Sequence, residues 1–132
     1  MKILIINGPN LNLLGSREPE IYGTVGMPEF LDQLKQSFPE NDIAFFQSNH
    51  EGEIIDYLQD STFDALIINP GALSHYSYSI ADCLKNIGKP KIEVHISNIY
   101  QREEFRQKSV TAMYADAVLS GFGLNGYRLA IL

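Results

Sequence analysis

The chain has 132 residues, of which 45% are hydrophobic and 20% charged, and its formal net charge at pH 7 is −6. These values are typical of one globular domain and exclude disordered, collagen-like and low-complexity proteins. No apolar run approaches the roughly 20 residues of a membrane span, and the acidic balance disfavours nucleic acid or an anionic membrane as partner. The N-terminal apolar stretch is short, and a single cysteine, Cys83, allows no internal disulfide. We therefore expect a cytoplasmic protein with no membrane or nucleic-acid partner.

Short apolar runs rich in β-branched residues alternate with helical patterns along the chain. In the first half, the predicted elements are a strand over 2–6, a helix over 27–38, a strand over 43–47 and a helix that opens with a capping box at Ser48 and Glu51. In the second half, they are a strand over 64–68, a helix from about Ser74 to Asn86, a strand over 91–95, a helix from a capping box at Asn98 and Gln101 to about Lys108, and a strand over 115–120.

Strict alternation of strands and helices favours a parallel sheet that is covered by helices on both faces. Right-handed crossover connections leave few topologies for such a sheet. With five strands, we expect a flavodoxin-like, doubly wound α/β fold with strand order 2-1-3-4-5, in a single domain over 1–132. A four-stranded sheet is the structural alternative.

Polar side chains gather after the carboxyl ends of the predicted strands, which is where open α/β sheets bind ligands. Asn10 follows the first strand, Asn69 and His75 follow the third, and His95 and Ser97 end the fourth. The opposite ends of the strands carry residues that are typical of solvation. The sequence therefore predicts an active site at the carboxyl edge of the sheet.

Glu93 and His95 lie two residues apart on a predicted strand, so both side chains face the same way. This spacing fits an acid/base histidine that has a carboxylate beside it, and it also fits a histidine with a purely structural hydrogen bond. Two histidines and a glutamate could ligate zinc, but no HExxH or similar spacing is present, so we predict no metal.

Arg102 and Arg106 lie four residues apart on a predicted helix and would share one face near His95. They could bind a carboxylate or phosphate, or form surface ion pairs with Glu103 or Glu104. The predicted start of this helix, near Ser97, would add backbone N–H groups that favour an anion.

The stretch from Asn7 to about Gly26 is much longer than the usual 2–6 residues of a βα loop. It carries Arg17 and Tyr22 and follows the first strand, beside the predicted pocket. A surface loop without a role is one interpretation. Its position favours an active-site lid at about 16–24.

Five segments closely resemble the type II 3-dehydroquinases, from residue 3 to about 130: NGPNLNLLGSREPEIYG (7–23), QSNHEGEIIDYL (47–58), NPGALSHYS (69–77), IEVHISNIYQREEFRQKS (92–109) and GFGLNGYRLA (121–130). The resemblance implies a flavodoxin-like fold and a hydro-lyase that converts 3-dehydroquinate, a small carboxylate, to 3-dehydroshikimate through an enolate. It further implies aromatic amino acid biosynthesis by the shikimate pathway, no cofactor, no metal, and a homododecamer built from trimers.

The family's functional residues carry over to matching positions of this chain. By this resemblance, Tyr22 is the general base, Arg17 stabilises its anionic form and the transition state, and His95 protonates the departing hydroxyl. The substrate contacts implied are Asn69, His75, Ile96, Ser97 and Arg106, with Asp82 reaching the site of a neighbouring subunit. Asn10 and Arg102 match further pocket positions, and Glu93 is a candidate from its place beside His95.

Three features depart from the family pattern. The segment VTAMYAD after Ser109 is unlike the usual pattern, which blurs the boundary of the fifth strand. Tyr76 and Tyr78 stand near His75 where smaller residues are usual, and the chain stops at Leu132, short of the final helix of many members. Two alternative functions remain: a lyase or isomerase for another small hydroxy acid, and a flavodoxin-like ligand-binding module that has lost catalysis.

Overall fold

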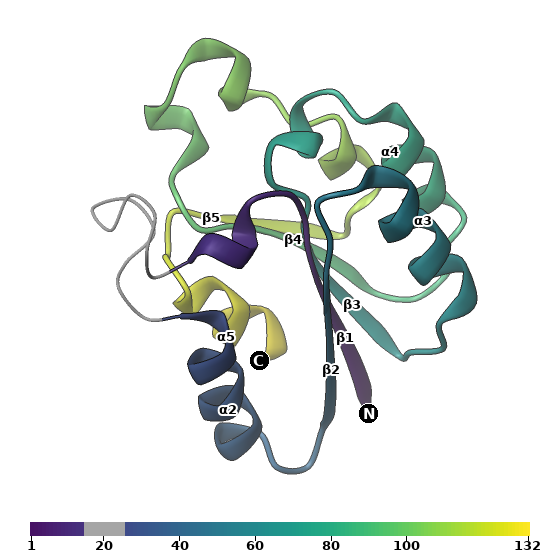
Figure 1. Cartoon of the computed structure of the whole chain (residues 1–132), viewed down its shortest axis with the longest axis vertical. Coiled ribbons are helices and arrows are strands. Elements are labelled where there is room, and N and C mark those ends of the chain that lie inside the picture. Colours follow the sequence, from purple (N-terminus) through teal and green to yellow (C-terminus); the bar gives the residue numbers. More distant parts are fainter. Residues whose placement is uncertain (15–25) are drawn as a thin grey trace.

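The computed structural model describes residues 1–14 and 26–132, so the predicted lid at about 16–24, with Arg17 and Tyr22, lies outside the described residues. Five parallel strands form one sheet in the order β2-β1-β3-β4-β5, which confirms the predicted flavodoxin-like topology (Figure 1). They are β1 (Lys2–Asn7), β2 (Asp42–Gln47), β3 (Ala65–Asn69), β4 (Lys91–His95) and β5 (Ala117–Ser120).

In residues 1–14 and 26–132, four α-helices and five 3₁₀ turns accompany these strands. The helices are α2 (Met27–Ser37), α3 (Glu51–Asp60), α4 (Tyr78–Lys85) and α5 (Asn125–Ile131). The 3₁₀ turns are η1 (Leu11–Leu13), η2 (Gly71–His75), η3 (Ile99–Gln101), η4 (Glu104–Gln107) and η5 (Thr111–Tyr114). Within the described ranges, no helix is both long and apolar enough to cross a membrane.

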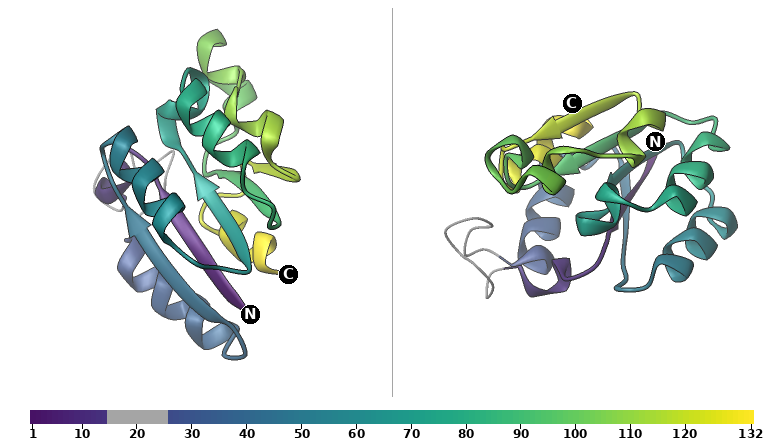
Figure 2. Two further views of the ribbon diagram at one scale, coloured as in Figure 1. Left: turned by 90° about the vertical axis from the view of Figure 1, so that its right-hand side faces the viewer. Right: turned by 90° about the horizontal axis from the view of Figure 1, so that it is seen from above.

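The inner strand β1, which lies between β2 and β3, is buried on both faces, and alternate side chains pack into two separate cores. Ile3 and Ile5 pack with α2 and α5, whereas Leu4 and Ile6 pack with α3 and α4. All four side chains are at most 3% exposed, and each contributes about 1.5–3 kcal/mol by burial. Figures 1 and 2 show α2 and α5 on one side of the sheet and α3 and α4 on the other.

The register of the strands brings polar residues together at the carboxyl edge. Asn7 pairs with Asn69 on β3, and His95 pairs with Ser120 on β5. The turn after β1 passes so close to the end of β3 that a Cβ at Gly8 would lie 2.2 Å from the Pro70 carbonyl oxygen. Any larger residue at Gly8 would therefore push these two strand ends apart.

The prediction of one helix from about Ser74 to Asn86 is wrong, because the segment is divided between η2 and α4. Ser77 has an extended backbone conformation, and its Oγ accepts a hydrogen bond from Ile80 N at 3.1 Å as the N-cap of α4. The same hydroxyl donates to Glu51 Oε2 on α3 at 2.5 Å. Because Ser77 caps α4 and also contacts α3, the chain begins a new helix at this position instead of continuing one from residue 74.

The helix predicted from Asn98 to Lys108 is also replaced, by the short turns η3 and η4. Asn98 does act as an N-cap, since its side chain accepts from Tyr100 N at 3.1 Å. The other predicted capping box is absent: His50 is the N-cap of α3, and Ser48 Oγ instead donates to Glu53 Oε1 at 2.5 Å. Reversal of the chain within a few residues requires tighter turns than an α-helix provides.

The C-terminal end also differs from the expectation. The fifth strand begins at Ala117 rather than at residue 115, and the two-turn helix α5 follows it where no helix was expected. Tyr127 of this helix is fully buried and packs on Phe30 of α2, with 6.2 Å between the ring centroids. The apolar Leu124 and Ala130 join the same core. Packing on the sheet therefore stabilises a helix that is too short to be stable alone.

Candidate active site

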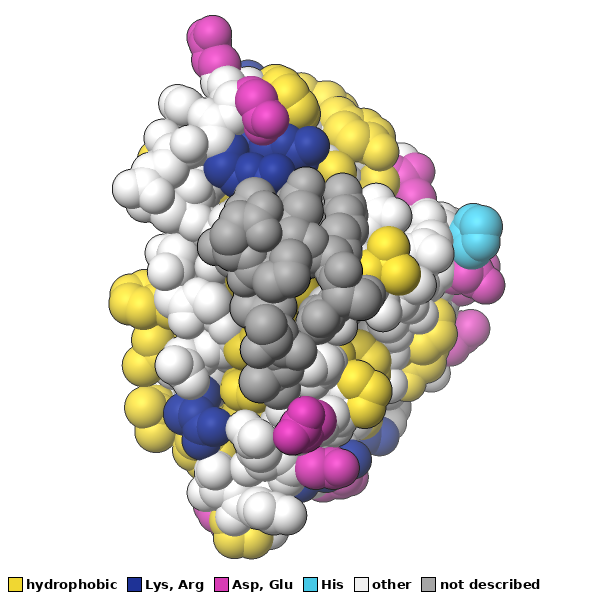
Figure 3. Space-filling model, turned by 60° about the vertical axis from the view of Figure 1, so that its left-hand side comes forward, with side chains coloured by type: hydrophobic (Ala, Val, Ile, Leu, Met, Phe, Trp, Pro, Cys, Tyr) yellow, Lys and Arg dark blue, Asp and Glu magenta, His cyan; other side chains and the backbone are white. Residues whose placement is uncertain are grey.

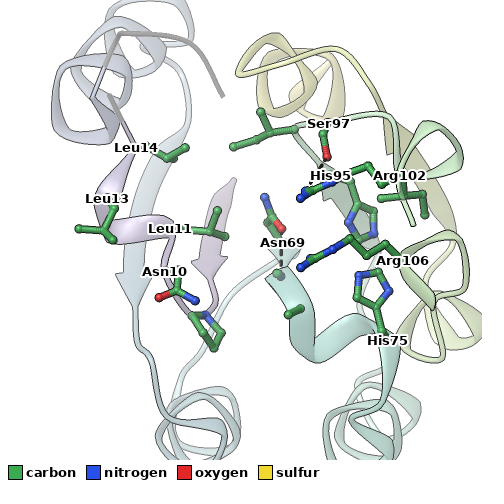
Figure 4. A pocket seen from close by; sticks show the side chains of 15 residues that line it. Asn10, Leu11, Leu13, Leu14, Asn69, His75, His95, Ser97, Arg102 and Arg106 are labelled. Atoms are coloured by element: carbon green, nitrogen blue, oxygen red, sulfur yellow. Dashed lines mark hydrogen bonds between the residues drawn. The ribbon is translucent and has the colours of Figure 1, made fainter. Parts of the chain in front are cut away.

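A pocket lies at the carboxyl ends of β1, β3 and β4 (Figure 4). Its lining comes from the segments that follow these strands: Pro9, Asn10, Leu11, Leu13, Leu14, Asn69, Gly71, Ala72, His75, His95, Ile96, Ser97, Ile99, Arg102 and Arg106. A cavity therefore lies at the carboxyl edge of the sheet, where the sequence predicts the site.

The pocket has two chemically different walls. In Figure 4 the leucines of η1, with Asn10, form one wall, and the two histidines, Ser97 and the two arginines form the other. Asn69 lies between them at the base. Such a cavity surrounds one face of a small ligand with apolar groups and directs charged and hydrogen-bonding groups at the other.

Glu93 and His95 form a hydrogen-bonded pair beneath the polar wall, as their spacing on β4 predicted. His95 Nε2 lies 2.7 Å from Glu93 Oε2, and the two residues are 5% and 0% exposed. Ser109 Oγ also donates to Glu93 Oε2 at 2.7 Å, and Thr111 Oγ1 donates to Glu93 Oε1. Both carboxylate oxygens are thus satisfied by side chains.

These contacts set the charge of Glu93. Burial by itself raises the pKa of this carboxyl, but the hydrogen bonds and the charge of His95, with Thr111 and Ser109, outweigh burial and leave the pKa of Glu93 below its usual value. An ionised carboxylate only accepts hydrogen bonds, so His95 Nε2 is the donor. This leaves His95 Nδ1 as the ring nitrogen available to another partner, which suits proton transfer.

His75 is held in one tautomer by the backbone. Its Nδ1 donates to the Lys108 carbonyl oxygen at 2.7 Å, and its ring packs edge-on against Phe105 with centroids 6.1 Å apart. The ring points into the pocket below Arg106 (Figure 4). His75 Nε2 therefore takes no part in this backbone contact.

Arg102 and Arg106 both line the pocket, although they lie on separate turns and not on one helix. Arg106 Nε is 2.7 Å from Glu103 Oε2, and Arg102 Nη1 is 3.5 Å from Ser97 Oγ. Arg106 thus lines the cavity and also forms the predicted ion pair with Glu103. Figure 3 shows a compact group of basic side chains on one face, in a chain whose net charge is −6.

The expected anion site at a helix N-terminus near Ser97 is wrong, because the three-residue turn η3 replaces that helix. Ser97 itself lines the pocket, as does the buried Ile96, whose carbonyl oxygen accepts from Gly123 N at 3.0 Å. Asn10 also lines it, with a left-handed backbone (φ 70°) and its N–H donated to Asn49 Oδ1. The arginine side chains are therefore the cationic groups that this wall offers.

Two predicted site residues of the described part of the chain do not line the pocket: Glu93, which lies behind His95, and Asp82. Asp82 is exposed on α4 and does not line the cavity. His75 and Asp82 do not lie on one continuous helix, because the chain leaves helical geometry at Tyr76 and Ser77. No group of three or more His, Cys, Asp and Glu side chains that could hold a metal ion occurs in 1–14 and 26–132.

Several residues of the site were not found from the sequence. The leucines of η1 look like ordinary core residues in a sequence, and Ser109 and Thr111 reach Glu93 from 16 and 18 positions away. Asn7 and Tyr127, which lie behind Asn69, were also missed as partners. Asn7 directly follows a predicted strand, which places it at the carboxyl edge of the sheet. Nothing local in the sequence pairs it with Tyr127.

The fold and pocket together define a flavodoxin-like α/β protein with a small-molecule site that combines a buried Glu–His pair with arginines. A sequence profile described as "Dehydroquinase class II" matches residues 1–132. The chain is 52% identical to the 3-dehydroquinate dehydratase of Thermotoga petrophila, over 99% of this chain and 92% of that protein. It is 53% identical to a 3-dehydroquinate dehydratase of Clostridium botulinum, over 98% of this chain and 90% of that protein.

Solved structures agree with these sequence relatives. The fold matches the type II dehydroquinase from Butyrivibrio crossotus with a TM-score of 0.95 and 47% identity, over 99% of this chain and 94% of that chain. It matches the type II dehydroquinase from Propionibacterium acnes with a TM-score of 0.90 and 42% identity, over 98% and 92% of the two chains. The chain belongs to the class II dehydroquinase family.

Proposed function

We propose that this chain is a 3-dehydroquinate dehydratase, a hydro-lyase that removes water from 3-dehydroquinate through an enolate to give 3-dehydroshikimate. The observation that carries the proposal is the pocket of a family member in which a buried Glu93–His95 pair lies beside two arginines. Elimination of water next to a ketone needs a base, an acid and tolerance of negative charge. The pocket supplies the acid and the positive charge from described residues.

Arg102 and Arg106 are proposed to bind the substrate carboxylate. Their guanidinium groups point into the cavity (Figure 4), and arginine presents planar pairs of N–H donors that match a carboxylate. Binding the carboxylate at this wall would place the ring of the substrate over Asn69 and against the leucines of η1. His75, Ile96 and Ser97 are proposed as further substrate contacts, with Asn10 at the opposite wall.

His95 is proposed as the acid. Glu93 accepts a hydrogen bond from His95 Nε2 and so fixes the ring, which leaves a proton carried on Nδ1 to be donated to the departing hydroxyl. Glu93 thus acts through His95. This division of roles follows the general pattern in which a buried carboxylate orients a histidine and stabilises its charged form.

Tyr22 is proposed as the base that removes the proton beside the ketone, with Arg17 beside it. A tyrosine must lose its own proton before it can accept another, and a nearby guanidinium favours the tyrosinate. These two assignments rest on the family resemblance, because both residues lie outside the described segments. No cofactor or metal takes part in the proposed reaction.

The proposed setting is also taken from the family. We propose that the chain works in the cytoplasm, in the shikimate pathway of aromatic amino acid biosynthesis, as a homododecamer built from trimers. Large apolar side chains on the surface support self-association; they include Tyr76, Tyr78, Tyr100, Phe105 and Phe122, all more than half exposed.

The test is ultraviolet absorbance after 3-dehydroquinate is added, because the conjugated product absorbs and the substrate does not. We expect turnover by the wild-type protein, and a loss of about 10²–10⁴-fold in kcat for Tyr22→Phe, which removes the base. Tyr57→Phe is the matched control, since Tyr57 stacks on Phe46 away from the pocket. Absence of any signal from the wild type would indicate a binding module, and near-native turnover by Tyr22→Phe would refute that base.

A further inference from the structure

A continuous chain of hydrogen bonds lies behind the base of the pocket and links three elements. Asn69 Nδ2, at the end of β3, is 3.0 Å from Tyr127 Oη on α5. Tyr127 Oη is in turn 2.6 Å from Asn7 Oδ1, at the end of β1. Asn69 alone of these three residues lines the cavity, so Asn7 and Tyr127 have no direct access to a ligand there.

The direction of this chain is fixed by a backbone group. Gly71 N lies 3.1 Å from Asn69 Oδ1, and a backbone N–H can only donate, so the atom it meets must be the amide oxygen. The amide nitrogen of Asn69 therefore faces Tyr127 and donates to it. Since the Tyr127 oxygen accepts this bond, its own proton is directed to Asn7 Oδ1.

Two observations support this assignment of donors and acceptors. Tyr127 is 0% exposed, and burial raises the pKa of its hydroxyl far above the usual range, so the proton it donates is retained. Asn7 Nδ2 is buried and has no hydrogen-bond partner among the described residues. Asn7 nevertheless keeps its oxygen toward Tyr127, because the reversed amide would leave the Tyr127 proton without an acceptor.

We propose that Tyr127 is a positioning residue, which fixes the Asn69 amide so that its remaining N–H and oxygen lone pair bind a substrate hydroxyl. This inference rests on the proposed function for its substrate. An amide oriented in this way offers one donor and one acceptor, which together match the donor and acceptor of one hydroxyl group. Without the Tyr127 hydroxyl, the Asn69 amide would keep only its bond from Gly71 N.

The test compares Tyr127→Phe with the wild type and with Tyr57→Phe in steady-state kinetics on 3-dehydroquinate. Loss of a substrate contact that is equally strong in ground state and transition state raises KM without lowering kcat. We expect Tyr127→Phe to raise KM about tenfold and to keep kcat within about threefold. We expect Tyr57→Phe to change neither constant. An unchanged KM in Tyr127→Phe would overturn the proposal.

A double-mutant cycle separates positioning from general support of the fold. If Tyr127 acts through Asn69, the Tyr127→Phe substitution has no further effect on KM in an Asn69→Ala background. Equal losses in both backgrounds would show that Tyr127 acts independently of Asn69, and the proposal would fall. Asn69→Ser takes the place of Asn69→Ala in the cycle if the alanine variant does not fold.

A crystal structure of ligand-free Tyr127→Phe tests the same inference without any substrate. We expect the Asn69 amide to rotate or to occupy two orientations in this variant. An Asn69 side chain that stays in place, with its oxygen on Gly71 N, would overturn the proposal. A wild-type protein that fails to turn over 3-dehydroquinate would refute the proposed function alone, and the structural result would still decide whether Tyr127 positions Asn69.

Discussion

Glu93 carries a negative charge in the interior of the protein, where an isolated carboxylate would be strongly disfavoured. Its charge persists because His95, Ser109 and Thr111 together occupy both carboxylate oxygens. The lowered pKa of Glu93 means that the folded state favours the ionised carboxylate over the neutral carboxyl more strongly than the unfolded state does. The ionised carboxylate of Glu93 therefore stabilises the fold, in addition to its hydrogen bond with His95.

Glu93→Gln approximates the protonated carboxyl at every pH. The ionised group contributes stability above the ordinary glutamate pKa of about 4.3, and this contribution is lost as the pH falls through the lower folded value. We expect Glu93→Gln to reduce the free energy of unfolding by about 1–3 kcal/mol at pH 7. The difference from wild type shrinks as the pH falls below about 4, as measured by urea denaturation at several pH values.

Glu53→Gln provides the control for this measurement. Glu53 is an exposed glutamate on α3 that accepts one bond from Ser48 and lies away from the pocket. We expect a smaller change in unfolding free energy for this variant. A loss in Glu93→Gln that stays constant from pH 7 to pH 3 would show that the charge of Glu93 is not its source.

At the scale of single residues, the sequence located the carboxyl-edge side chains well. Asn69, His95 and Ser97 line the pocket because parallel strands end at the same edge, which a strand pattern alone predicts. The partners of these residues could not be predicted in the same way. Ser109 and Thr111 reach Glu93 only because the chain doubles back after η4, and no local pattern encodes that return.

At the scale of elements, the junction between η2 and α4 depends on Ser77. Its buried hydroxyl caps α4 and also bonds to Glu51 on α3. We expect Ser77→Ala to lower the free energy of unfolding by about 1–2 kcal/mol, since a cap and an interhelical hydrogen bond are both lost. Urea denaturation would show a lower midpoint with an unchanged slope.

Ser79→Ala is the matched control on the same helix. Ser79 is exposed in the first turn of α4, and substitutions at such positions change stability by less than about 0.5 kcal/mol. If the two serine variants were equally stable, the double role assigned to Ser77 would be wrong.

The strands were predicted more reliably than the helices, for a physical reason. Buried parallel strands are continuous apolar runs, and those of β1, β3 and β4 differ by at most one residue at either end from the ranges predicted. The helical pattern over 74–86 continued through Ser77, because an apolar spacing does not reveal which serine serves as a cap. The short α5 was missed because its stability comes from packing on the sheet and not from its own sequence.

At the scale of the whole molecule, Asp82 has a proposed role only in the oligomer, because it does not reach the pocket of its own chain. Asp82 is exposed on α4 and does not line the pocket of its own chain. By the family resemblance, it contributes to the site of a neighbouring subunit. A site that is shared between chains has a direct test, because two variants with different defects can complement each other.

We expect Asp82→Ala and Tyr22→Phe proteins, unfolded together and then refolded, to show more turnover than the sum of the two parents refolded separately. Some sites in mixed oligomers would combine an intact Tyr22 with an intact Asp82. Asp56→Ala, an exposed aspartate variant on α3, replaces Asp82→Ala in the control mixture. If native mass spectrometry detects mixed oligomers whose turnover only equals the sum, Asp82 does not act across subunits.

The hydrogen bond between Tyr127 and Asn7 joins positions that are 120 residues apart. During synthesis, which adds about 5–20 residues per second, β1 emerges from the ribosome long before α5 exists. Asn7, at the end of β1, therefore has no Tyr127 partner until almost the whole chain has been made. A nascent chain that ends before Tyr127 lacks both hydrogen bonds of its hydroxyl, so the base of the pocket is completed only when translation is nearly finished.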